Sequence, residues 1–176
     1  MITSAITLLD SVEVRLTIAG TFNGDLYVTL AHESGFSVLL NRTGRTASDA
    51  FGYSDDGFNI TLAGSAANGD VHVYRTAGTP NPGSPLIGTW QPDARNVDPD
   101  SVTDGSARTA FLSSFNDLDA NGQWRLFVAD VSTGEVHTLT SWGLDLMGIP
   151  EPATISLALV GLVALAYAVR RARSQA

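Results

Sequence analysis

The sequence contains no cysteine and no lysine, and both absences narrow what the protein can do. Without cysteine there can be no disulfide, no thiolate metal site and no cysteine nucleophile. All ten basic residues are therefore arginines, and eighteen acidic residues bring the net charge to −8. Such a surface repels nucleic acid and anionic lipid, and a cation is its more natural partner. We expect no nucleic-acid partner.

Motifs that mark common catalytic sites are also missing. The chain has no Gly-x-Ser-x-Gly elbow, no His-Glu-x-x-His pair and no glycine-rich phosphate loop. Its three histidines, His32, His72 and His137, are scattered along predicted strands. A catalytic site needs a nucleophile with a base, a metal cluster or paired carboxylates. We therefore expect that the protein is not an enzyme.

The C-terminal residues differ in character from the rest of the chain. An uncharged apolar stretch, Ala153–Val169, follows Pro150 and ends at a group of arginines. A membrane-spanning helix needs about 17–25 apolar residues, and arginines stay on the cytoplasmic side. A buried C-terminal helix is the alternative, but it would normally show a polar face. We predict a transmembrane helix over residues 153–169, a cytoplasmic tail over 170–176 and an ectodomain outside the cytoplasm.

This three-part tail resembles the PEP-CTERM sorting signal of Gram-negative bacteria. The matching residues are the motif Pro150, Glu151 and Pro152, the apolar span, and the basic cluster Arg170, Arg171 and Arg173. The resemblance implies that a membrane-embedded exosortase, a transpeptidase-like enzyme, recognises the tail and cuts near the motif. It also implies single-pass anchoring in the inner membrane, followed by transfer to the cell surface or extracellular matrix.

Without Glu151 and the three tail arginines, seven arginines and seventeen acidic residues remain, so the ectodomain carries a net charge near −10.

The start of the chain does not fit export through a sorting tail. Residues 1–10 have neither the basic region nor the apolar run of a signal peptide. A tail-sorted surface protein should carry one. We expect that the chain is a truncated or mis-started form of a longer product.

Before the tail, short alternating runs are separated by glycine-bearing turns. In Ser11–Ile18 every second residue is apolar, which is typical of a half-buried strand. Further strands are predicted at Asp25–Leu30, Phe36–Leu40, Phe58–Leu62, Val71–Tyr74, Ala110–Phe115, Gln123–Asp130 and Thr138–Met147. Residues 78–85 and most of 88–106 are predicted to be irregular. The pattern predicts an all-β, antiparallel sandwich over residues 1–148, with 149–152 as the sorting motif.

These strands carry a second resemblance. Gly24-Asp25-Leu26, the run Asn121–Asp130 and the run Leu139–Leu146 are similar to the P domain. This is the jelly-roll sandwich that follows the catalytic domain in subtilisin-like proprotein convertases and occurs on bacterial surface proteins. In P domains an acidic pair together with the Gly-Asp-Leu aspartate can contribute to calcium binding. The resemblance therefore implies Asp25, Asp55 and Asp56 as Ca²⁺ ligands.

Other candidate positions admit simpler readings. Asp117 and Asp119 match the first half of a calcium loop, but Val128 stands at the twelfth position, which excludes an EF-hand. We favour a hairpin turn at Asn121-Gly122 with both aspartates solvated. Trp124 and Trp142 fall on the apolar face of two late strands and are predicted to lie in the core on the same inner face. Trp90 lies in a predicted loop.

Three functions are compatible with these features. The leading hypothesis is an exported, non-catalytic surface or matrix protein with a structural or adhesive role, sorted through its PEP-CTERM tail. A second hypothesis is the C-terminal fragment of a secreted subtilisin-like serine protease. A third is a carbohydrate-binding module for extracellular polysaccharide, for which Trp90 is the remaining tryptophan candidate.

Overall fold

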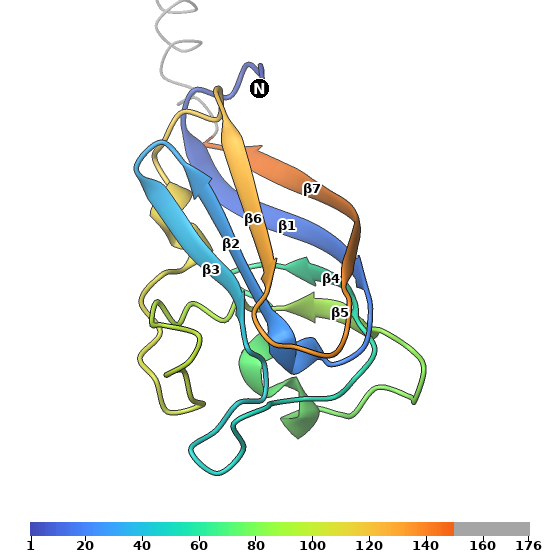
Figure 1. Cartoon of the computed structure of the whole chain (residues 1–176). Coiled ribbons are helices and arrows are strands. Elements are labelled where there is room, and N and C mark those ends of the chain that lie inside the picture. The colour runs from blue at the N-terminus through green and yellow to red at the C-terminus, as the bar shows by residue number, and fades with distance from the viewer. Residues whose placement is uncertain (150–176) are drawn as a thin grey trace, which may run out of the picture.

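The computed structural model describes residues 1–149, which form two stacked β-sheets (Figure 1). One sheet has four strands in the order β5-β4-β1-β7, and the other has three in the order β3-β2-β6. The strands are β1 (Leu9–Ala19), β2 (Leu26–His32), β3 (Gly35–Asn41), β4 (Phe58–Leu62), β5 (Leu86–Trp90), β6 (Trp124–Asp130) and β7 (Thr138–Gly148). An all-β sandwich is thus confirmed. The predicted span 153–169 lies outside the described residues, and within residues 1–149 no helix is long and apolar enough to cross a membrane.

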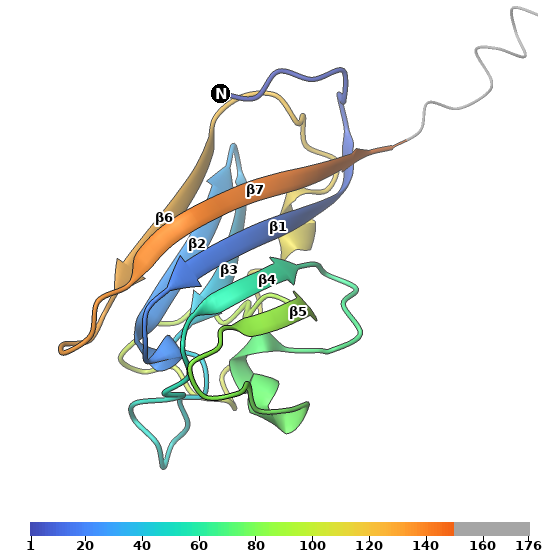
Figure 2. The same cartoon turned by 90° about the vertical axis from the view of Figure 1, so that its right-hand side faces the viewer.

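Strand β1 is the centre of the four-stranded sheet and follows the predicted alternation. Val12, Val14, Leu16 and Ile18 are almost completely buried, while the residues between them are more exposed. In Figure 2, β7, β1, β4 and β5 lie side by side. Strand β1 pairs antiparallel with both β4 and β7. Strands β4 and β5 run parallel, so the predicted antiparallel arrangement is wrong for this pair. The long β1–β7 ladder extends from Ala19↔Thr138 to Leu9↔Gly148.

The hydrophobic core lies between the sheets. Strands β2 and β3 contribute Leu26, Val28, Leu30, Leu39 and Leu40, all with no exposed surface. Trp124 on β6 is also buried, as predicted, with 8 % of its surface exposed. Its indole stacks on His32 with ring centroids 4.1 Å apart, and its Nε1 donates to the Ala120 carbonyl at 3.1 Å.

Three local predictions in the middle of the chain are wrong. Residues Val71–Thr76 form a 3₁₀ helix (η2), because the Asp70 side chain accepts a hydrogen bond from the His72 amide and caps the turn. Residues Leu112–Phe115 form another 3₁₀ helix (η3), which buries Leu112 and Phe115. Trp90, predicted to lie in a loop, belongs to strand β5, although most of residues 88–106 is irregular as predicted. A short 3₁₀ helix (η1, Asn23–Asp25) precedes β2.

The prediction for Trp142 is also wrong. Trp142 pairs with buried Leu16, so the alternation was read correctly, but β7 is an edge strand. With no further strand beside it, Trp142 keeps 39 % of its surface exposed. Trp124 moreover belongs to the other sheet, so the two tryptophans do not share one inner face.

The irregular segment after β5 covers the outer edge of β3. The amides of Asp93 and Ala94 donate to the carbonyls of Leu39 and Val38, and the Val38 amide donates to Ala110. Buried polar groups hold this segment in place. Asp93, with no exposed surface, accepts from the His72 ring at 2.7 Å and pairs with Arg95 at 3.2 Å. Arg95 also pairs with Asp70 at 2.8 Å. The irregular segment that this network holds therefore takes the place of an additional strand at the β3 edge.

Candidate functional site

The end of strand β7 is where the described part of the chain meets the sorting tail. Gly148 pairs with Leu9 at the last position of the ladder, and the Ile149 amide still donates to the Leu8 carbonyl at 3.0 Å. The motif begins at the next residue, Pro150. Proline has no amide hydrogen, so it cannot extend this donor series. The sandwich therefore ends directly at the motif, with no intervening linker.

The N-terminal segment lies at the same end of the sandwich (Figure 1). Ile2 forms an antiparallel bridge with Gly122, with N···O distances of 2.8 and 3.1 Å. The Ser4 amide donates to the side-chain oxygen of Asn121 at 2.5 Å. Two further hydrogen bonds join the start of β1 to the segment before β6. The Leu9 amide donates to the Leu118 carbonyl at 2.9 Å, and the Asp117 amide donates to the Leu9 carbonyl at 2.8 Å. At the end of the fold that carries the tail, hydrogen bonds thus hold the N-terminal segment against the segment before β6.

Two of the three predicted calcium ligands, Asp55 and Asp56, accept hydrogen bonds from protein groups. Asp55 accepts two hydrogen bonds from Arg75, at 2.8 and 2.9 Å, and one from the Tyr74 hydroxyl at 2.7 Å. Burial alone would raise the pKa of Asp55, but these hydrogen bonds hold it below its usual value. Asp56 accepts from the Gly83 amide at 2.8 Å.

Asp25 lies in a different environment. Its carboxylate is 5 % exposed and lies 3.7 Å from Arg42. Burial raises the pKa of Asp25, and the Arg42 charge offsets only part of this effect. Within residues 1–149, no three histidine, cysteine or acidic residues form a group that could hold a metal ion. The three carboxylates therefore do not form the predicted joint site: Asp55 and Asp56 are bound by arginine and main-chain donors, whereas Asp25 lies apart, with its Oδ1 buried near Arg42 and without a hydrogen-bond partner.

The remaining aspartate motif agrees with the prediction only in part: both aspartates are exposed, but Asn121-Gly122 forms no hairpin, because β6 pairs with β2 and follows helix η3. The Asp119 side chain accepts hydrogen bonds from the amide and the side chain of Asn121, at 2.9 and 2.7 Å. These bonds lower the pKa of Asp119. Asp117 and Asp119 are both exposed. The motif forms a local turn that leads into β6.

The histidines make structural contacts. His72 is fully buried, and its two ring nitrogens contact the Asp93 carboxylate and the Arg45 carbonyl at 2.7 and 2.9 Å. His32 lies between the carbonyls of Gln123 and Asp119, at 3.2 and 2.7 Å. His137 contacts Asp130 at 2.8 Å. The His72–Asp93 pair has the geometry of an oriented base, but both nitrogens are occupied and neither reaches solvent.

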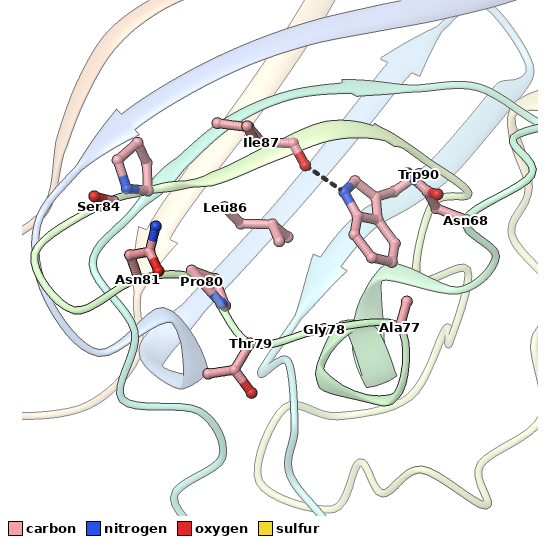
Figure 3. Close-up of a pocket in the computed structure, with 11 residues that line it drawn as sticks. Asn68, Ala77, Gly78, Thr79, Pro80, Asn81, Ser84, Leu86, Ile87 and Trp90 are labelled. Atoms are coloured by element: carbon pink, nitrogen blue, oxygen red, sulfur yellow. Dashed lines mark hydrogen bonds between the residues drawn. The ribbon is translucent and has the colours of Figure 1, made fainter.

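A pocket of about 540 Å³ lies beside strand β5 (Figure 3). Its walls come from the end of η2, the loop before β5, and β5 itself. Trp90 contributes to the wall but is only 5 % exposed, and its Nε1 donates to the Ile87 carbonyl at 2.9 Å. It is therefore not the exposed aromatic platform considered from the sequence. The polar groups of the lining belong to Asn68, Thr79, Asn81 and Ser84, and none of the described lining residues is ionisable.

Comparison with known families supports the reading of the tail. Residues 148–173 match the family described as the PEP-CTERM protein-sorting motif. Comparisons with curated proteins and with solved structures gave no match. The predicted PEP-CTERM resemblance is confirmed, whereas the P-domain resemblance of the ectodomain is not. The motif implies an exported protein that an exosortase, a membrane enzyme, processes and that becomes exposed at the surface.

Two features of this site escaped the sequence reading. The His72–Asp93–Arg95 network joins helix η2 to the irregular segment after β5, and no spacing in the sequence signals such a network. The pocket beside β5 forms because residues 86–90 pair with β4. The glycines and prolines in that region indicate a loop, so the sequence does not predict this strand. The position of the motif at the end of the last strand was visible in the sequence, since Leu144 and Leu146 continue the alternation up to Gly148.

Proposed function

We propose that the protein is a non-enzymatic, exported component of the cell surface or extracellular matrix, delivered by exosortase processing of its tail. In this proposal residues 153–169 span the inner membrane once and the arginines after them remain in the cytoplasm. The sandwich lies outside the cytoplasm and stays attached to the membrane through this span until cleavage near Pro150–Pro152 releases it. The motif match at residues 148–173 is the observation that carries the proposal.

The position of the motif supports this order of events. Every residue of the β1–β7 ladder precedes Pro150, and the last sheet-like hydrogen bond ends at Ile149. Cleavage within or after the motif therefore removes no strand and no core side chain of the described fold. The released product would keep the whole sandwich.

Expression in a host that contains an active exosortase tests the proposal. The chain in which Pro150, Glu151 and Pro152 are replaced by alanine should stay in the membrane fraction, while the parent chain is released. Pro82→Ala, which changes an exposed loop proline, is the matched control and should be released normally. Equal release of the triple variant and the parent would contradict the proposal.

An adhesive role would require a partner, and we propose an uncharged segment of extracellular polysaccharide at the pocket beside β5. The amide and hydroxyl side chains of its lining suit sugar hydroxyls, and the apolar wall of Leu86 and Pro80 suits the face of a sugar ring. Asn68→Asp with Asn81→Asp would place charge in the pocket and should weaken retention on the host polysaccharide. Asn96→Asp, an exposed change elsewhere, is the control. Unchanged retention would remove the pocket from the proposal.

A further inference from the structure

Large apolar side chains are exposed where the chain leaves the sandwich. Leu8, Met147 and Ile149 keep 48 %, 42 % and 43 % of their surfaces exposed. We call these three residues the exit patch. They lie at the last positions of backbone pairing before the sorting motif. The Ile149 amide donates to the Leu8 carbonyl, and Met147 pairs with Ser11.

The exit patch faces away from the core. The register of β1 shifts between Leu9 and Ser11, so Leu9 and Val12, although three residues apart, are both buried on the inner face. Leu8 and Ser11, each directly before one of these buried residues, therefore lie on the outer face. Ile149 and Met147 lie opposite Leu8 and Ser11 on the neighbouring strand, and cross-strand partners share one face. The three apolar side chains therefore form one outward surface at the tail end of the four-stranded sheet.

The surroundings of the patch point to an uncharged apolar partner. Asp10 and Asp117 are exposed beside it, and Asp117 lies next to β1 through its bond to the Leu9 carbonyl. These carboxylates disfavour an anionic surface. The chain that continues from Ile149 carries the uncharged run Ala153–Val169 three residues further on. Whatever apolar phase receives that run therefore lies within a few residues of the exit patch.

We propose that the exit patch docks the unprocessed ectodomain onto the lipid surface of the membrane that holds its tail. This inference rests on the proposed insertion of residues 153–169. Side chains such as leucine, isoleucine and methionine partition into the boundary between headgroups and acyl chains when they lie on one face of a structure. Three residues would bind weakly on their own, but attachment to an inserted tail makes the contact intramolecular and raises its effective concentration.

Docking has a consequence for processing. It holds the end of β7, and with it the motif, at the depth where a membrane-embedded enzyme works. After cleavage the tether is gone and the weak contact no longer retains the domain. The same patch can thus position the substrate before cleavage and allow its release afterwards.

Site-specific fluorescence on the full chain tests the proposal. Because the chain has no cysteine, a single Leu8→Cys substitution accepts an environment-sensitive probe at the patch alone. The full chain is reconstituted into phosphatidylcholine vesicles that contain lipids with a nitroxide quencher in the upper acyl chain. We expect a blue shift and loss of emission for the probe at position 8, unchanged at high salt. Partial replacement of phosphatidylcholine by phosphatidylglycerol should weaken both effects.

Two further labels separate the outcomes. Phe51→Cys is the matched control, because Phe51 is 65 % exposed in the β3–β4 loop, which lies at the opposite end of the sandwich (Figure 1). Ala164→Cys reports insertion of the tail. A quenched probe at 164 with position 8 indistinguishable from position 51 would overturn the docking proposal and leave the proposed function standing. An unquenched probe at 164 would show that the tail does not insert, which overturns both.

As a second variant, Leu8→Ser with Met147→Ser should reduce quenching of a probe at Ile149→Cys. Both positions are exposed, so the fold should tolerate them, and an unchanged melting curve verifies this. Undiminished quenching at position 149 in a folded double variant would contradict a role for the patch.

Discussion

At the scale of single residues, the two late tryptophans have different roles despite their similar sequence contexts. Trp124 is buried among Phe115 and His32, with ring centroids 5.0 and 4.1 Å from its own. Trp142 lies on an edge strand and is 39 % exposed. Alternation predicts which side of a strand a residue faces. It does not predict whether another strand covers that side, and this is why one of two equivalent predictions was wrong.

Alanine substitution should separate them. Truncating a buried tryptophan typically costs about 3–5 kcal/mol, a large part of the roughly 5–15 kcal/mol that stabilises a domain. Trp124→Ala should therefore unfold the ectodomain or lower its midpoint in denaturant strongly, and Trp142→Ala should change it much less. Chemical denaturation followed by circular dichroism measures both. Similar losses for the two variants would mean that Trp142 is packed as tightly as Trp124.

The buried His72–Asp93 pair should make stability depend on pH. Burial alone would lower the pKa of His72, but the hydrogen bond and charge of Asp93 outweigh it and raise this pKa above about 6.5. The protonated ring is therefore favoured in the folded state. Its contribution is complete below the unfolded pKa of about 6.5 and is lost as pH rises through the folded pKa. Arg95 and Asp70 complete the charged surroundings.

We expect that the free energy of unfolding decreases as pH rises above about 6.5, and that His72→Gln flattens this decrease. Denaturation curves at a series of pH values give the slope, which is informative even where the variant is less stable overall. His137→Gln is the control, since His137 lies beside Asp130 outside this network. The same slope in parent and His72→Gln would exclude the pair as its source.

At the scale of elements, regular strands were predictable and the connections were not. Strands β1, β2, β3, β4, β6 and β7 all overlap predicted strand segments. Alternation identifies β1, which buries one face, whereas Val38, Leu39 and Leu40 of β3 are consecutive and all buried. Helices η2 and η3 were predicted as strands, since short apolar runs such as Val71–Tyr74 carry no period that distinguishes the two. What decides η2 is the cap from Asp70 and the burial of Tyr74.

The β1–β7 ladder is the element that joins the fold to its tail. Its pairs run to Gly148, and those nearest the tail include Leu146↔Val12 and Gly148↔Leu9. A chain that ends at Ile149 keeps the whole ladder, whereas one that ends at Gly143 loses the pairs that cover Leu9, Val12 and Val14. We expect cooperative melting close to that of the full chain for the first, and no cooperative transition for the second. A folded chain ending at Gly143 would contradict this role of β7.

At the scale of the whole molecule, the sandwich forms the stable fold and the tail carries the sorting motif. In the sandwich, Asp55 pairs with Arg75 and Asp93 with His72, so these charged groups hold the fold together. The recognisable address lies in residues 148–173. The candidate site was predictable because proline, glutamate and an apolar run form a local pattern. The structure does not bring Asp25, Asp55 and Asp56 into one group, and sequence order does not reveal that Arg75 binds Asp55 while Asp25 lies apart beside Arg42.

The central claim is that this chain is cut at its sorting motif and released with its sandwich intact. Mass spectrometry of the C-terminal peptide of the released protein, from a host with active exosortase, tests it most directly. The account predicts that the mature chain contains Gly148 and Ile149, ends near Pro150–Pro152, and lacks the residues from Ala153 onward. Released protein that still carries Arg173 would contradict it.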